Sequence, residues 1–261
     1  MNRLKNRGFT IIEAMIVLAV TSAMFIVAML AFNGQQERTR FTQGTRDFES
    51  KIRDVANDIS TGYFSDTKAF TCNGTGTSVT FTSGTNTQGT NESCIFLGKA
   101  VQLTGCTEAC TSLSFVTVAG KRQTSGKEVT SLTDAKPTVA PSAYNDDYLM
   151  QYGLRVTGAF DEAGNAISGI ALLTSLASYD ANDDPIGGSQ SSRLFSVPTG
   201  GQAFSLKVAG ITESNLIKSA TVCLANDNGS AARKAVMTIG DTASGISTEL
   251  VVDDVPEVCN V

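Results

Sequence analysis

The chain begins with a short basic leader and a long apolar run. The leader, residues 1–8, carries Arg3, Lys5 and Arg7, whereas residues 9–32 contain only one charged side chain, that of Glu13. A helix needs about 20 apolar residues to cross the core of a bilayer, so this pattern predicts a transmembrane helix over residues 9–32. A carboxylate inside such a segment is energetically costly and is therefore a candidate for function.

Beyond the apolar run, the pattern changes to that of an amphipathic helix. Between residues 33 and 60 charged residues return, and large apolar residues recur on one face of a 3.6-residue period. These apolar residues are Phe41, Phe48, Ile52, Val55 and Ile59. We therefore expect one helix over residues 9–60, about 75 Å long, whose second half packs on a folded domain. Gly34 and Gly44 are expected weak points, since a glycine costs about 1 kcal/mol inside a helix.

The remainder, residues 61–261, has the pattern of a β domain. Short runs of Val, Ile, Phe, Leu and Thr alternate with clusters of Gly, Asn, Asp and Ser, which is typical of antiparallel strands. Strands are predicted over residues 78–82, 94–97, 100–104, 113–118, 148–156, 168–175, 193–197, 203–208, 220–224, 234–239 and 247–252. Residues 71–93 are predicted to form a flexible loop around one short strand. The expected fold class is α+β: a long N-terminal helix, half transmembrane and half amphipathic, packed on a large, mostly antiparallel β head.

Charge argues against one class of partner. The chain has 20 basic and 25 acidic residues, a net charge of −5, whereas a general nucleic-acid binder presents a basic face. Lys121, Arg122 and Lys127 could still form a local basic patch. We expect no nucleic-acid partner.

Six cysteines in a segment expected to be exported predict disulfides, because that compartment is oxidising. They are Cys72, Cys94, Cys106, Cys110, Cys223 and Cys259. Fifteen connectivities are possible, and proximity along the chain favours 72–94, 106–110 and 223–259. A four-thiolate zinc site is the alternative, but the spacings lack a convincing pair of zinc knuckles.

Catalytic chemistry has little support in the sequence. The chain contains no histidine, which excludes Ser-His-Asp and Cys-His arrangements, and it has no phosphate-binding glycine loop. Three pairs of aspartates, at 146–147, 183–184 and 253–254, are interpreted as solvated turn carboxylates. We expect neither an enzyme nor a cofactor.

One acidic loop has the oxygen density of a calcium site. Its candidate ligands are Asp180, Asn182, Asp183 and Asp184, but their spacing differs from that of an EF-hand loop. No metal is therefore expected, and this loop is the weak calcium candidate.

Two ordinary explanations compete for the N-terminal segment. A cleaved secretory signal has an apolar stretch of about 7–15 residues and a small-x-small site after it, whereas this run is longer and ends without such a site. A plain membrane anchor fits the length and the basic flank, which would stay cytoplasmic. It explains neither the glycine at residue 8 nor the acid at residue 13.

Residues 7–13, Arg-Gly-Phe-Thr-Ile-Ile-Glu, resemble the leader junction of the type IV pilin and pseudopilin superfamily. The resemblance covers about the first 30 residues. It implies cleavage by a prepilin peptidase between Gly8 and Phe9, N-methylation of Phe9, and a role for Glu13 in assembly. Residues 94–103 are similar to a hairpin of large minor pilins and H-type secretion pseudopilins, and residues 221–240 to their turn between two strands. The pair Cys223–Cys259 resembles the C-terminal disulfide loop of many pilins.

The resemblance implies four regions and a structural role. Residues 1–8 are the leader, 9–32 the transmembrane and polymerisation helix, 33–60 its amphipathic continuation, and 61–261 the head. The free α-amine of Phe9 could pair with the Glu13 carboxylate of a neighbouring subunit and so offset the cost of both charges. The alternative for Glu13 is that its side chain reaches the membrane surface.

The expected function is that of a prepilin-like structural subunit of a type IV pilus or a type II secretion pseudopilus, and a minor one given its large head. Expected partners are the prepilin peptidase, other pilin or pseudopilin subunits and the membrane. The expected location is the bacterial cytoplasmic membrane, single-pass with a cytoplasmic N-terminus, and a periplasmic or extracellular filament after assembly. The alternative is a membrane-anchored binding protein, an adhesin or DNA-uptake tip, delivered by a pilin-type helix.

Overall fold

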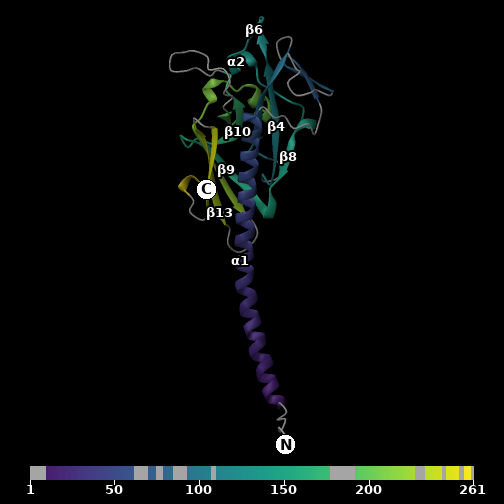
Figure 1. The fold of residues 1–261 in the computed structure, drawn as a ribbon. Coiled ribbons are helices and arrows are strands. Elements are labelled where there is room, and N and C mark those ends of the chain that lie inside the picture. The colour runs from purple at the N-terminus through teal and green to yellow at the C-terminus, as the bar shows by residue number, and fades with distance from the viewer. Residues whose placement is uncertain are drawn as a thin grey trace, which may run out of the picture. The chain divides into compact units, whose positions relative to one another are not determined.

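The computed structural model describes residues 10–61, 70–74, 79–84, 93–106, 110–176, 192–226, 233–242, 245–252 and 256–259; at positions 30–34 it describes the helical backbone alone. The chain divides into two compact units, Met1–Thr42 and Gln43–Val261. Helix α1, Ile11–Ser60, contributes to both units. The rest of the second unit is built mostly from antiparallel strands (Figure 1), so the protein is of the α+β class.

The larger sheet of the second unit is antiparallel at every pairing. Its strand order is β11 (Ser192–Pro198), β10 (Ile167–Thr174), β3 (Cys94–Gln102), β4 (Ser112–Lys121) and β7 (Thr138–Val139). A sixth strand, β8 (Asp146–Leu149), pairs with the same edge of β4 as β7, farther along that strand. This sheet therefore has one edge made of two short strands, with residues 140–145 between them.

A four-stranded antiparallel sheet forms the other layer. Its order is β14 (Gly245–Val252), β13 (Lys234–Thr242), β12 (Ser219–Asn226) and β9 (Leu154–Asp161). Two small hairpins are separate from these sheets: β1 (Phe70–Asn73) with β2 (Thr80–Ser83), and β5 (Gln123–Thr124) with β6 (Lys127–Glu128). The short helices are α2 (Leu132–Ala135), α3 (Phe204–Ala209), η1 (Ser142–Tyr144), η2 (Gln151–Gly153), η3 (Glu213–Asn215) and η4 (Glu257–Cys259).

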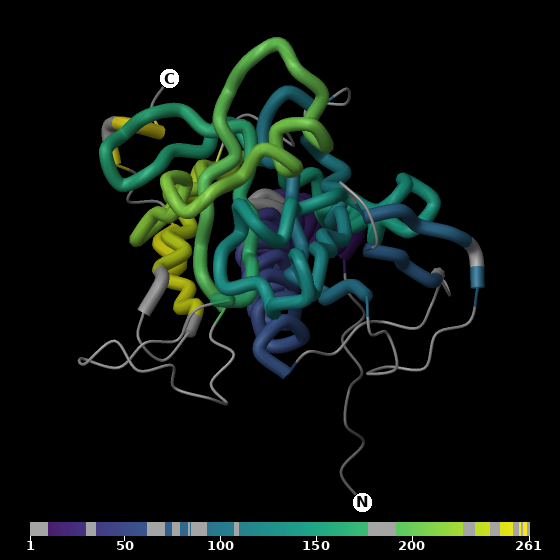
Figure 2. The backbone as a smooth tube through the Cα atoms, turned by 90° about the horizontal axis from the view of Figure 1, so that it is seen from above, coloured from purple at the N-terminus to yellow at the C-terminus, as the bar shows by residue number. Residues whose placement is uncertain are grey.

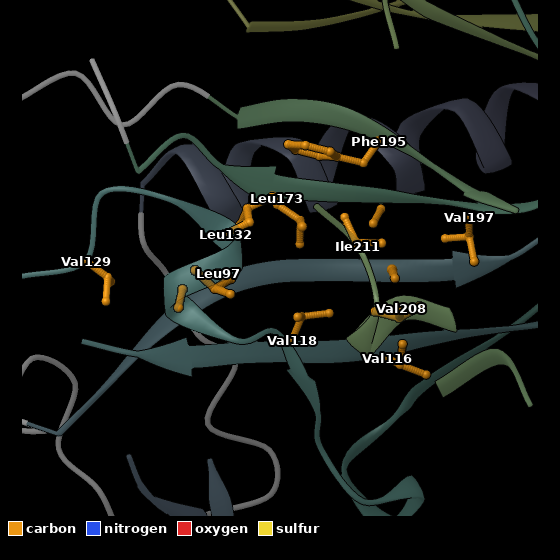
Figure 3. Close-up of a cluster of buried hydrophobic side chains, with 13 residues drawn as sticks. Leu97, Val116, Val118, Val129, Leu132, Leu173, Phe195, Val197, Val208 and Ile211 are labelled. Carbon is orange, nitrogen blue, oxygen red and sulfur yellow. The ribbon is translucent and has the colours of Figure 1, made fainter. Parts of the chain in front are cut away.

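One face of the larger sheet is covered by α2 and α3. Side chains alternate between the two faces of a strand, so Val116 and Val118 of β4 share a face, and both belong to a buried apolar cluster. Leu132 of α2 and Val208 of α3 lie in the same cluster. Figure 3 shows these side chains gathered on one side of the strands, with the short helices over them.

The opposite face of the larger sheet packs on the second half of α1. Phe115, which alternates with Val116 on β4, is buried, and its ring centroid lies 5.4 Å from Lys51 Nζ of the helix. The ring of Phe48 stacks on Tyr148 of β8 at 6.1 Å between centroids. Seen from above, this part of α1 lies against strands of the second unit (Figure 2), while one face of the helix stays exposed.

The predicted apolar stripe is buried throughout. Phe41, Phe48, Ile52, Val55 and Ile59 all lie in the core, and α1 ends at Ser60, as the pattern predicted. The periodicity is reliable here because a helix that packs on a sheet must present its apolar residues on one side.

Gly44 is a contact position and not merely a weak point of the helix. A Cβ at this residue would lie 3.1 Å from the backbone oxygen of Gln151 and 3.5 Å from Cδ2 of Tyr152. The absence of a side chain therefore lets the helix approach η2 closely.

Three stretches of the chain differ from the strand predictions. The two strands predicted over residues 94–97 and 100–104, in the stretch that is similar to a hairpin, are one continuous strand, β3, which has a bulge between Phe96 and Gly98 and is paired on both sides. Residues 148–156 are divided between β8 and β9 by η2, where Tyr152 has a φ of 59°. Residues 203–208, predicted as a strand, lie mostly in helix α3, because their apolar side chains cover a sheet instead of joining it.

The predicted loop over residues 71–93 also contains more structure than expected. It holds parts of two paired strands, β1 and β2, where one short strand was predicted. The Cys72–Cys94 disulfide links this hairpin to β3.

Candidate functional site: the N-terminal helix

The first part of α1 is an exposed apolar surface. Residues Ile11–Met29 have a mean hydropathy of 2.4, and none of this segment is buried. The only ionisable side chain in it is that of Glu13. By length and composition, this segment is a candidate membrane anchor or signal sequence.

Thr10 directly precedes this helix, whose first turn contains Glu13. The backbone N–H of Glu13 donates to Thr10 Oγ1 at 3.3 Å, and the N–H of Ala14 donates to the backbone oxygen of Thr10 at 3.1 Å. A threonine followed three residues later by a glutamate is the spacing of a capping box. The capping role of Thr10 was missed in the sequence, although that spacing is the signal that could have revealed it.

The position of Glu13 is favourable for a carboxylate in one further respect. The first turn of a helix carries partial positive charge from unpaired N–H groups, which favours an acid there by about 0.3–1 kcal/mol in water. Within the part of the chain that the structure describes, the Glu13 carboxylate has no ion-pair partner.

Thr21 is a polar residue within the apolar segment, and its hydroxyl is satisfied by the helix itself. Its Oγ1 donates to the backbone oxygens of Val17, at 2.8 Å, and Leu18, at 3.1 Å. A hydroxyl bonded back to its own helix costs little in a bilayer. Thr21 is therefore compatible with a membrane-spanning role.

The second part of α1 is fastened to the larger sheet by polar contacts on β8. Lys51 Nζ pairs with Asp146 Oδ2 at 2.7 Å, and the hydroxyl of Tyr148 donates to Asp47 Oδ2 at 2.7 Å. Burial of the tyrosine raises the pKa of Tyr148 above its ordinary value, and the hydrogen bond and negative charge of Asp47 raise it further. Both contacts tie successive turns of one helix to one short edge strand.

The same part of the helix is also fastened to the smaller sheet. Arg53 Nε donates to Thr248 Oγ1 of β14 at 2.6 Å, and Thr248 Oγ1 in turn donates to Glu49 Oε1 at 3.1 Å. Arg53 and Glu49 also form an ion pair within the helix at 2.6 Å. The amphipathic half of α1 is therefore a structural element of the second unit, bonded to both of its sheets.

An acid in the last turn of α1 pairs with a buried lysine of the larger sheet. Lys99 Nζ of β3 lies 3.5 Å from Asp58 Oδ2, and the side chains are 6% and 29% exposed. A buried ammonium requires a partner of opposite charge. Asp58 supplies it.

The predicted cleavage and calcium residues lie outside the described part of the chain. These are Gly8 and Phe9 at the leader junction, and Asp180, Asn182, Asp183 and Asp184 in the acidic loop. Among the described residues, no group of three or more His, Cys, Asp or Glu side chains is placed to hold a metal ion.

The six cysteines form three disulfides. They are Cys72–Cys94, Cys106–Cys110 and Cys223–Cys259, with Cα separations of 6.2, 5.1 and 5.5 Å. These are the pairs that proximity along the chain favours. The last one joins strand β12 to η4 near the C-terminus.

The structure bears on one predicted pair of aspartates and on one basic patch that the sequence left open. Asp146 and Asp147 lie on strand β8 and not in a turn, and Asp146 pairs with a helix lysine. In the basic cluster, Lys121 is buried and Arg122 lies 3.9 Å from the carboxylate of Glu128. These three basic residues therefore do not form a continuous exposed basic patch.

No protein family model, curated protein or solved structure matches this chain.

Proposed function

We propose that this chain is a structural subunit of a type IV pilus or a type II secretion pseudopilus. In this proposal a prepilin peptidase cleaves between Gly8 and Phe9 and methylates the new N-terminus, and the helix then polymerises with those of other pilin-type subunits. The observation that carries the proposal is the lone carboxylate of Glu13 in the first turn of an otherwise apolar, fully exposed helix segment.

The chemistry of assembly follows from that carboxylate. Removal of the leader creates a cation at the α-amine of Phe9, four residues before Glu13. An unpaired charge in the membrane is costly, and pairing the amine of one subunit with the acid of the next relieves the cost for both. Because such a contact joins different positions on two identical helices, it is heterologous, and a heterologous contact that does not close into a ring produces an open helical filament.

Glu13 also has a local explanation, because its spacing from Thr10, whose Oγ1 accepts from the Glu13 N–H, is that of a capping box. The two roles can be separated because glutamine serves in a capping box but carries no charge. In the filament proposal, Glu13→Gln assembles as poorly as Glu13→Val, while both variants still insert in the membrane. Filament incorporation by Glu13→Gln at the wild-type level would refute the pairing role and leave only the cap.

Processing is tested on the full chain expressed with a prepilin peptidase. Mass spectrometry of the mature N-terminus is expected to find methylated phenylalanine, and Gly8→Ala is expected to leave the full-length precursor in the membrane. A mature chain that begins at Met1, or normal maturation of the Gly8→Ala variant, would overturn the proposal.

A membrane-anchored binding protein is the second candidate, and the observation that favours it is a cavity of about 500 Å³ in the second unit. In that case the helix delivers the head, as in an adhesin or uptake tip. Nucleic acid is a poor candidate for its ligand, because the chain is acidic and Lys121 is buried. Deleting head loops should spare assembly but abolish adhesion or uptake.

A further inference from the structure

A cavity of about 500 Å³ lies at one end of the sheet face that carries α2 and α3. Its walls come from β3, β4, β7, η1 and the start of α3. The lining includes Gln102, Ser114, Val116, Ser142, Phe204 and Ser205. Sites for small ligands typically measure about 300–1,000 Å³ and combine an apolar wall with a few placed polar groups.

The cavity exists because the edge of β4 is shared by two short strands. β7 pairs with Val118 and Ala119, and β8 pairs with residues 112–115. The segment 140–145 between them leaves the sheet edge after one hydrogen bond, from the N–H of Ala140 to the backbone oxygen of Thr117 at 2.9 Å. A hollow therefore remains between this segment and α3.

One wall of the cavity is an aromatic ring held against bare backbone. Gly169 lies at a β-bulge of β10, and a Cβ there would come within 2.8 Å of Phe204 Cε2. The ring of Phe204 also packs against the buried cluster of the sheet. Its position is thus fixed by the sheet before any ligand arrives.

The amide of Gln102 is held with its oxygen available. Its Nε2 donates to the backbone oxygens of Thr104 and Gly105, both at 3.1 Å. Since both amide protons are used in this way, the side-chain oxygen is left as a hydrogen-bond acceptor.

Ser114 is held in a chain of hydrogen bonds. Its Oγ donates to Asp147 Oδ1 at 2.7 Å and accepts from Asn145 Nδ2 at 3.0 Å. This arrangement orients two polar side chains of the lining without any ligand, which is the preorganisation that binding sites require.

The ligand class follows from the remaining groups. Ser142 and Ser205 add two exposed hydroxyls, and none of the lining residues carries a charge. An anion would require a cation in the wall, and an aliphatic ligand would leave the polar groups unpaired. A ligand that is neutral, rich in hydroxyls and apolar on one face satisfies both conditions.

We propose that this cavity binds a neutral carbohydrate. The apolar face of a pyranose ring lies on Phe204, and its hydroxyls bond to Gln102 and to the serines of the wall. All lining residues belong to the unit Gln43–Val261. The proposal is therefore independent of whether the N-terminal helix polymerises, and it can fail while the filament proposal holds, or the reverse.

The test uses the full chain in zwitterionic detergent micelles, because alkyl glycoside detergents would compete for the site. Saturation-transfer NMR is recorded with the methyl glycosides of glucose, galactose, mannose and N-acetylglucosamine at millimolar concentration. At least one is expected to bind, with transfer concentrated on the protons of one ring face. Phe204→Leu, which keeps apolar contact with the cluster, is expected to weaken binding about tenfold.

Blocking variants and a matched control make the result specific to the cavity. Ser142→Trp and Ser205→Trp, both at exposed positions of the wall, are expected to abolish binding. Gln123→Trp, on the exposed β5–β6 hairpin, is expected to leave it unchanged. Three results would each overturn the proposal. They are no binding of any of the four glycosides, binding by the two tryptophan variants of the wall equal to that of the wild type, and binding of adenosine alone, which would indicate a base-stacking site.

Discussion

The pair formed by Asp58 and Lys99 allows a sharp test of how the helix is held in the second unit. The substitution is Asp58→Asn, which removes one charge and keeps the shape of the side chain. Lys99 lies between Thr117 and Leu172 on the neighbouring strands, and both of these residues are buried. Its ammonium group would then lie in the interior without its carboxylate.

The magnitude can be worked out from the distance and the exposure. At 3.5 Å, and with an effective dielectric constant of about 20, the attraction is about 5 kcal/mol before desolvation. Removing one partner of a buried pair typically costs about 3–5 kcal/mol. Asp58 lies in the last turn of α1, where an acid opposes the helix dipole by about 0.3–1 kcal/mol. We therefore expect Asp58→Asn to lower the free energy of unfolding by about 2–4 kcal/mol.

The assay is urea unfolding of the full chain in micelles at neutral pH, followed by far-UV circular dichroism. Lys99→Met is expected to be close to neutral, because it removes the buried charge and its desolvation cost, and the Asp58 carboxylate that is left, with its side chain 29% exposed, can be hydrated. The double variant should resemble Lys99→Met and not the sum of the two single variants.

Asp54 supplies the matched control for this experiment. It is exposed one turn earlier on the same helix and makes no ion pair among the described residues, so Asp54→Asn changes the net charge equally. A loss of stability in Asp58→Asn no larger than that in Asp54→Asn would refute the reasoning.

Three further predictions concern other parts of the second unit. Gly44→Ala is expected to destabilise the protein by about 1 kcal/mol despite a better helix propensity, because the new methyl group crowds the backbone oxygen of Gln151 at 3.1 Å. If urea unfolding instead shows stabilisation of about 1 kcal/mol, η2 moves away to accommodate the methyl group and the prediction is wrong. Glu213 bonds to the backbone N–H of Leu132 and to Thr133 Oγ1; burial alone would raise the pKa of Glu213, but these hydrogen bonds and one from its own backbone outweigh burial and lower it. The stabilising effect of the Glu213 carboxylate is therefore complete above the ordinary carboxyl pKa of 4.5 and is lost as the pH falls through the lower folded-state pKa. Glu213→Gln should reduce the loss of thermal stability in that acidic range. A variant whose melting temperature depends on pH as the wild type's does would contradict this role of Glu213. Replacing each disulfide by two serines is expected to cost about 4, 3 and 2 kcal/mol for Cys223–Cys259, Cys72–Cys94 and Cys106–Cys110, since the closed loops span 36, 22 and 4 residues. The opposite order of stability losses among the three variants, measured by thermal unfolding, would contradict the loop-entropy argument.

Local patterns in the sequence were sufficient for the elements whose environment repeats along the chain. The stripe from Phe41 to Ile59 identified both the end of α1 and its buried face, because a helix against one surface meets the same environment every three to four residues. The three disulfides join cysteines that are close in sequence, so chain proximity alone favoured those pairs. The exposed apolar segment with Glu13 was likewise recognisable from composition.

The errors arose where the environment of a residue comes from distant parts of the chain. Residues 203–208 are apolar enough for a strand, yet most of them form α3, whose apolar side chains pack on the apolar face of a sheet. Lys99 interrupts an apolar run, as a residue in the turn of a hairpin would. The contact with Asp58, on a helix far away in sequence, explains why a lysine lies inside a continuous strand. Glu213 caps α2 across a similarly long separation.

The same division applies to function. The candidate assembly residue, Glu13, is visible in the sequence because a single charge stands out against an apolar background. The cavity proposed to bind carbohydrate is not visible in the sequence, because Gln102, Ser142 and Phe204 are ordinary residues until β-pairing and the packing of α3 bring them to one hollow. Periodicity along a chain reports which side of an element is buried, whereas the neighbour on that side depends on the order in which strands and helices pair in space.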